Sequence, residues 1–369
     1  MENTQIKSLS PFEQKLNALF EKVFSRISFV DKMLFVFHLQ IMIKAGLSIV
    51  AALKILSEEM ENKKLKKIIA QIKNEVEKGR QLSEVLAQFP DIFPEIYVSM
   101  IAAGETAGTM EKSLLQVYTQ MKKSHELLSH VRGAMVYPAV VVVAIIGIAT
   151  EMIVFVLPKI LVMFKDFNAE LPLPTRILIG IVDFTQKYGI ELVIGIFLFI
   201  ALWIYLYKKP EFKRSIHAFM LHLPIFGKVI KEINLASFTL TLSSLLDSTI
   251  SIIEAVKITA SVQTNMVYRE TLLKVAENLK SGTTLSQNLS PYHDIFPPMV
   301  TEMVMVGEEA GKMNDMLKEL SEYYANEVDS MMKNFSTIIE PVIILVMGLM
   351  VAGIAVSVIM PMYSLAQSF

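Results

Sequence analysis

Several absences limit what this chain of 369 residues can do. It contains no cysteine, which excludes disulfides, thiolate metal sites and cysteine nucleophiles. Its 35 basic residues are balanced by 36 acidic ones, so no basic field exists to hold nucleic acid directly. Charged residues make up only 19% of the chain and hydrophobic residues 53%, whereas about 25% of the residues are charged in an average globular domain. This balance indicates a membrane protein with substantial water-facing parts.

Arrangements typical of catalysis or of cofactor binding are also missing. The histidine pairs 125/130 and 217/222 are five residues apart, so neither pair shares the i,i+4 helix face of a zinc site. No Gly-x-Ser-x-Gly elbow occurs. The run GEEAGKM at 307–313 has only three residues between its glycines and no Ser or Thr after the lysine, unlike a phosphate-binding loop. We therefore expect no catalytic residue, no cofactor and no metal, and a protein that is not an enzyme.

Three apolar stretches are long enough to cross a bilayer: residues 135–158, 189–207 and 338–361. A helix of about 20 residues spans a hydrocarbon core of about 30 Å. The N-terminus lacks the pattern of a signal peptide, and the basic run KKPEFKR at 208–214 directly follows the second stretch, so both are expected in the cytoplasm. The expected water-facing parts are two cytoplasmic domains (31–134 and 208–337), a periplasmic loop (159–188) and a periplasmic tail (362–369).

The chain contains an internal repeat. Residues 35–158 align without a gap with residues 238–361 at an offset of 203, and 27 of the 124 aligned pairs are identical. The matching pairs include the glycine–glutamate turns at 104–108 and 307–311, and Pro138 with Pro341. Each copy is one water-facing domain followed by one span, so the sequence predicts two copies in parallel orientation.

Within each copy the sequence predicts helices only. Apolar residues recur at helical spacing between 34 and 55, no segment alternates like a strand, and Gly79 is typical of a helix end. We expect Gly104 to end one helix and Gly108 to begin a long helix that bends at Pro138, where it enters lipid. The predicted fold class is an all-α membrane protein with two repeated cytoplasmic helical bundles and three transmembrane helices.

The order of short motifs on this duplicated frame is distinctive. It runs KAGLS at 44–48, Gly-Glu-x-x-Gly at 104–108 and 307–311, LPLPTR at 171–176, LPIFG at 223–227 and Glu-Pro at 340–341. With these motifs in this order, the chain resembles the inner-membrane platform proteins of type IV pilus and type II secretion machines. One departure is Asp247-Ser248-Thr249, where the family has a small residue followed by glycine.

The resemblance implies a scaffold without enzymatic activity in the bacterial inner membrane. Its implied partners are a cytoplasmic hexameric assembly ATPase, pilin or pseudopilin subunits and other inner-membrane components of the machine. We also expect a homo-oligomer surrounded by the lipid bilayer. An oligomeric membrane transporter or channel component is the alternative, although three spans leave little room for a transport path. A membrane enzyme is a weaker alternative, because the catalytic constellations are missing.

The candidate structural or partner-contact residues fall into three groups. The two corners contribute Gly104, Glu105 and Gly108, and Gly307, Glu308 and Gly311, in which glycine permits positive φ and a carboxylate favours the N-terminus of the following helix. Both glutamates are expected to hold the corner or to face a partner.

The other two groups lie at or in the membrane. Pro138 and Pro341 are placed where a bundle meets its span, and Glu151 and Glu340 are carboxylates within or at the end of spans. Buried membrane carboxylates normally face protein. Glu151 and Glu340 are therefore expected either to line a groove that guides another protein's helix or, for Glu340, to lie at the membrane interface. Glu191, at the outer end of the second span, can reach water.

Residues 1–30 form an expected N-terminal amphipathic segment. Between 11 and 29, one face of a helix would carry Phe12, Leu16, Phe20 and Ile27, with lysines opposite. Such a segment can lie on the membrane surface, pack on the first bundle or meet the ATPase, and the sequence leaves all three open.

Overall fold

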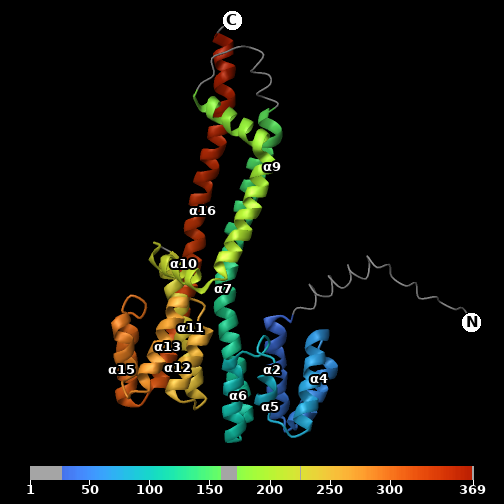
Figure 1. The fold of residues 1–369 in the computed structure, drawn as a ribbon, viewed down its shortest axis with the longest axis vertical. Helices are drawn as coiled ribbons and strands as arrows, with labels where there is room; N and C mark the ends of the chain where they lie inside the picture. The colour runs from blue at the N-terminus through green and yellow to red at the C-terminus, as the bar shows by residue number, and fades with distance from the viewer. Residues whose placement is uncertain (1–26, 159–172, 225, 368–369) are drawn as a thin grey trace, which may run out of the picture. The chain divides into compact units, whose positions relative to one another are not determined.

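The computed structural model describes residues 27–158, 173–224 and 226–367, and every regular element in these ranges is a helix (Figure 1). The chain divides into two compact units. One unit combines the residues up to Glu126 with Ile233–Tyr324, and the other combines Leu127–Glu232 with the residues from Ala325 onward. The all-helical prediction is therefore confirmed. Residues 1–26 of the N-terminal segment and residues 159–172 of the expected periplasmic loop lie outside the described residues.

The first bundle is built from six helices, and polar side chains cap the starts of the first three. Ser28, Ser48 and Asn62 accept hydrogen bonds from backbone N–H groups in the first turns of the helices that follow them, as N-caps do. Gly79, at φ 88°, follows the end of the third helix. The elements are α2 (Phe29–Lys44), α3 (Ile49–Glu59), α4 (Lys63–Glu77), α5 (Leu82–Leu86), α6 (Glu95–Ala107) and the start of α7 (Met110–Glu151).

The second bundle repeats this order. Phe35 packs against Phe93 in the first core with ring centroids 5.7 Å apart, and their counterparts Phe238 and Phe296 are 5.2 Å apart. Tyr268 adds a third ring to the second core and donates a hydrogen bond to the Ile295 carbonyl. The elements are α11 (Phe226–Asp247), α12 (Ile252–Val262), α13 (Met266–Leu279), α14 (Leu285–Leu289), the short η2 (Ser290–Tyr292), α15 (Pro298–Ala310) and the start of α16 (Met313–Gln367).

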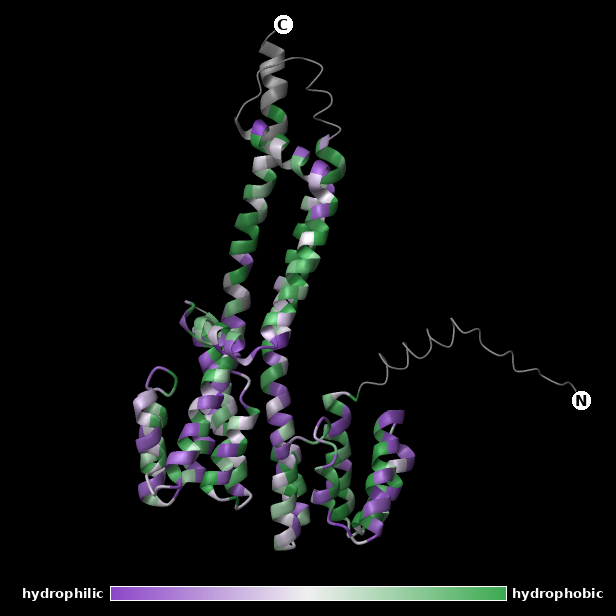
Figure 2. Ribbon diagram, viewed as in Figure 1, coloured by the Kyte–Doolittle hydropathy of each residue, from purple (hydrophilic) through white to green (hydrophobic). Residues whose placement is uncertain are grey.

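The last helix of each bundle continues as an apolar helix. α7 carries the fully buried bundle residues Leu114 and Val117 and then runs through Pro138 into a stretch of exposed Val and Ile side chains. α16 runs in the same way through Pro341. Figure 2 shows the hydrophobic colouring of these long helices and of α9 (Leu173–Tyr207). A bend at either proline stays a prediction.

Four helices are long and apolar enough to cross a membrane by length and composition. Three of them overlap the expected spans, namely α7 with the turn that follows it (Met110–Val156), α9 and α16, and their apolar windows are at most 12% buried in protein. The fourth is α11, whose window is 56% buried and which buries the polar side chains of Asn234, Thr239 and Thr241. We therefore assign α11 to the second bundle rather than to lipid.

The expected loop 159–188 is partly helical. α9 starts at Leu173, and Tyr188 interrupts it with φ −119°, directly before the expected span begins at Gly189. The first part of α9 packs on the π-helical turn η1 (Met152–Val156) that follows α7, and Leu157 and Val182 are buried together beside it. Helical structure thus continues from Leu173 through a segment that was expected to be a loop. After the second span, α10 (Pro210–His222) follows the basic residues Lys208 and Lys209.

Candidate functional site

A sharp corner joins α6 to α7 and, in the second copy, α15 to α16. Gly108 and Gly311 adopt the left-handed conformation, at φ 69° and 64°, and end their helices. The Thr109 N–H donates to the Gly104 carbonyl at 2.8 Å, which closes the cap. The expectation that Gly104 ends the helix is wrong, since α6 continues to Ala107. The GEEAGKM run is thus a helix–corner–helix, and no strand precedes it in the described chain.

Gly104 has a different reason to be glycine. A Cβ atom at this position would lie 2.0 Å from the Ser113 Oγ and 2.4 Å from the Ser113 Cβ. At Gly307 the nearest atom would be the Met313 Cα, at 3.0 Å. The missing side chain lets the two helices of each corner approach closely, and the first corner is the tighter one.

The two corner glutamates cap another helix of their own bundle. The Glu105 carboxylate accepts hydrogen bonds from the backbone N–H groups of Leu82 (2.6 Å) and Ser83 (3.0 Å) and from the Ser83 hydroxyl (2.6 Å). These N–H groups begin α5 and would otherwise lack partners, and the negative charge is favourable at a helix N-terminus. The sequence pointed to the helix after the corner, whereas the carboxylate reaches back to α5.

The second copy reproduces this cap. Glu308 accepts from the backbone N–H groups of Leu285 and Ser286 and from the Ser286 hydroxyl, with the Ser286 N–H at 3.0 Å. Three internal hydrogen bonds occupy each carboxylate, which gives both glutamates a structural role. Contact of either one with a partner stays a prediction.

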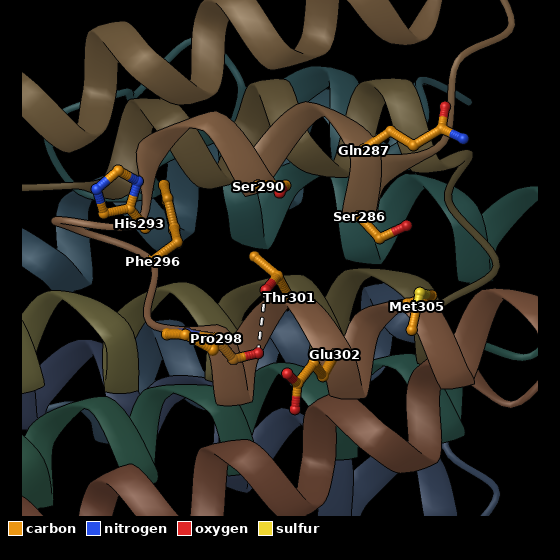
Figure 3. A pocket seen from close by; sticks show the side chains of 9 residues that line it. All are labelled: Ser286, Gln287, Ser290, His293, Phe296, Pro298, Thr301, Glu302 and Met305. Carbon is orange, nitrogen blue, oxygen red and sulfur yellow. Dashed lines mark hydrogen bonds between the residues drawn. The ribbon is translucent and has the colours of Figure 1, made fainter.

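A cavity of about 400 Å³ opens between α14 and α15 of the second copy (Figure 3). Ser286, Gln287 and Ser290 lie on one side, and Thr301, Glu302 and Met305 on the other. Within the described part of the chain, no group of three or more His, Asp or Glu residues is arranged to hold a metal ion. The lining presents hydroxyl, amide and carboxylate groups.

The membrane carboxylates occupy separate positions in the second unit. Glu151 ends the α-helical part of α7 and is exposed, directly before a π-helical turn at Met152–Val156. Glu340 is exposed on α16 beside Pro341, while Pro138 on α7 is buried. No contact joins Glu151 to Glu340 among the described residues, so the groove between spans stays a prediction. Glu191 lines a shallow hollow on α9 with Phe184 and Tyr188.

Charged groups gather at the membrane-proximal ends of the bundle helices. His130 of α7 lies 3.1 Å from Asp329 of α16, and a hydrogen bond from Lys333 lowers the pKa of Asp329. On α11, burial raises the pKa of Glu232, and Glu327 raises it further by like-charge repulsion.

A polar junction between the two bundles, buried at Gln120 and exposed at Asp247, was missed by sequence reasoning. Gln116 of α7 donates to the Asp247 carbonyl at 3.2 Å and accepts from the Ser248 hydroxyl at 3.1 Å. One turn further along α7, Gln120 is 2% exposed and accepts from the Ser244 hydroxyl at 2.6 Å. The available signal was the pair of glutamines four residues apart, together with the departure at Asp247-Ser248-Thr249.

That departure has a structural explanation. Thr249 keeps a left-handed backbone, at φ 60°, where the first copy has Gly46 at φ 88°. A β-branched residue is strained in this region. Asp247 and Ser248 in the same turn bond to Gln116 across the junction, so the second copy retains the turn shape and uses its side chains for contact with the first.

The comparisons with known proteins agree with this duplicated architecture. The family model "Type II secretion system (T2SS), protein F" matches twice, at residues 35–158 and 238–361. The chain belongs to this family. The two matches coincide with the two copies of the repeat, so the unit that the family model describes is one bundle with its span.

Relatives with assigned names come from both kinds of machine. The type IV pilus assembly protein PilC of Myxococcus xanthus is 31% identical over 336 residues, which cover 91% of this chain and 80% of the relative. The protein of the same name from Thermus thermophilus is 33% identical over 336 residues, which cover 91% of this chain and 82% of the relative. The type II secretion system protein F of Vibrio cholerae is 30% identical over 335 residues, which again cover 91% of this chain and 82% of the relative.

Proposed function

We propose that this protein is the inner-membrane platform of a type IV pilus or type II secretion machine. In this function it performs no bond chemistry, and its two bundles face the cytoplasm. It takes up movement from a cytoplasmic hexameric ATPase and uses it to insert pilin-like subunits into a filament or to extract them. Other inner-membrane components and further copies of the chain complete the assembly.

One observation carries the proposal: in each copy the helix that completes the bundle core is also the apolar span. Leu114 and Val117 anchor α7 in the first bundle, and Leu317 and Leu320 anchor α16 in the second, all fully buried. Because backbone hydrogen bonds make a helix stiff along its axis, tilting a bundle displaces its span. This connection suits a protein that passes force from the cytoplasm into the membrane.

The membrane carboxylates suit the handling of pilin-like helices within the membrane. A charge in lipid is costly and favours a polar or cationic partner. Glu340 lies on α16 beside Pro341, at the expected start of the last span, where a cationic group of a pilin-like helix can reach it. Glu191 provides a control, since it lies at the outer end of its span, where water can solvate it.

The test compares two single substitutions in the host's own machine. Glu340→Ala should leave the protein folded and inserted but reduce filament assembly or secretion to near the level of a strain without the protein. Glu191→Ala should assemble filaments normally. Both variants are compared at equal amounts of protein in the membrane, because loss of protein would imitate loss of function. Normal assembly by Glu340→Ala would show that this carboxylate is merely interfacial.

A further inference from the structure

The junction inside one chain uses two different faces of the repeat. The first copy contributes the α7 face with Gln116 and Gln120, and the second contributes the α11 face with Thr241, Ser244 and Asp247. α12 of the second copy also contacts α6 of the first. The contact is therefore heterologous: the first copy uses the start of α7, and the second uses its first long helix, α11.

Each copy therefore also carries the counterpart of the face that the other copy uses, and the junction leaves this counterpart uncovered; we call it the leftover face. At the repeat offset of 203, Gln116 and Gln120 correspond to Glu319 and Tyr323 on α16. Both are exposed, and Tyr323 is 50% exposed where Gln120 is 2%. On α2 the counterparts of Thr241, Ser244 and Asp247 are His38, Ile41 and Lys44, again all exposed, with Ile41 at 45%.

The two leftover faces complement each other in the pattern of the existing junction. Where Gln116 meets Asp247, the leftover pair is Glu319 and Lys44, which carry opposite charges. Where Gln120 meets Thr241 and Ser244, the leftover set is Tyr323 with His38 and Ile41. A tyrosine ring and an isoleucine bury apolar surface together, and the phenol and imidazole can hydrogen-bond.

We infer that the α16 face of one chain binds the α2 face of a second copy of the same chain, repeating between chains the junction that already joins the two bundles within one. The α16 face of one chain is thus covered by the α2 face of its neighbour, and each α2 face by the α16 face of the other neighbour. Because the contact is heterologous, repeating it gives a closed ring when the rotation closes.

This inference extends the homo-oligomer of the proposed function but needs neither the ATPase nor pilins for its test. The chain contains no cysteine, so introduced thiols are the only ones in the protein. Full-length Ile41→Cys and Tyr323→Cys chains are co-expressed with different tags and treated in membranes with a short thiol cross-linker. The expected product is a dimer that carries both tags and appears only when both variants are present. Gln120→Cys with Ser244→Cys in one chain is the positive control and should cross-link within the monomer.

A charge exchange tests the same contact without cysteines. Lys44→Glu and Glu319→Lys should each lower the amount of oligomer in detergent, and the double variant should restore it. Lys54→Glu, on the exposed surface of α3, is the matched control and should change nothing.

Three results would overturn the inference. One is Ile41→Cys chains that cross-link to one another as readily as to Tyr323→Cys chains, which would indicate a twofold contact. A second is mixed dimers that form only after residues 1–25 are deleted, which would show that the chain's own N-terminal segment covers α2. The third is an oligomer that survives both single charge reversals unchanged. Loss of filament assembly with the cross-link intact would instead contradict the proposed function alone.

Discussion

The two copies of the repeat share their cores and corners but differ in what covers their first long helix. In the second copy, α11 buries Thr241 against Gln120 of the first bundle, whereas its counterpart His38 on α2 is exposed. In the first copy, α2 leaves Leu34 and Ile41 exposed. The comparison teaches that the duplicated frame specifies the packing within a bundle, whereas the outer faces have diverged according to their neighbours.

The tightness of the two corners gives the largest expected difference between the copies. Gly104→Ala places a Cβ atom into Ser113 and should destabilise the first bundle by about 3 kcal/mol, whereas Gly307→Ala, with its nearest atom 3.0 Å away, should cost about 1 kcal/mol. Thermal unfolding of the purified variants, followed by circular dichroism, measures both. Equal losses would contradict the difference in packing.

The glutamate caps should instead behave alike in the two copies. Glu105→Ala and Glu308→Ala each leave the first N–H groups of a five-residue helix without their acceptor, at a cost of about 1–3 kcal/mol. The Gln variants retain an acceptor oxygen and should lose less. The same unfolding experiment applies, and a variant as stable as the parent would show that water replaces the carboxylate at little cost.

Much of this architecture could be predicted from the sequence. The repeat offset, the apolar stretches and the glycine at each corner follow from local patterns, since positive φ and helix ends depend on a few neighbouring residues. The target of Glu105 could not be predicted, because it reaches a helix 22 residues earlier in the chain. The Gln116 and Gln120 junction joins residues more than 120 positions apart. The glutamine pair and the departure at 247–249 mark polar positions in the sequence, but neither pattern identifies the other as its partner. The helix from Leu173 likewise packs on the turn at Met152–Val156 and on Leu157, which lie outside its own stretch of sequence.

The turn after the first long helix gives the smallest expected difference. Thr249→Gly removes the strain of a left-handed β-branched residue and should stabilise the second bundle by about 1 kcal/mol. The reciprocal Gly46→Thr should destabilise the first bundle by about 1–2 kcal/mol. Thermal unfolding of both variants measures the change. A gain in stability for Thr249→Gly with a loss for Gly46→Thr would support strain at Thr249, and a loss of stability from Thr249→Gly would refute it.

The proposed platform function requires two parallel copies with both bundles in the cytoplasm, each bundle continuous with its span. Fusions to a reporter enzyme that is active only outside the cytoplasm test this directly. A fusion after Asp166, which lies outside the described residues, should be active, and a fusion after Lys213, beyond the second span, should be inactive at equal expression. The reverse pattern would put the bundles outside the cytoplasm and contradict both the parallel topology and the platform function.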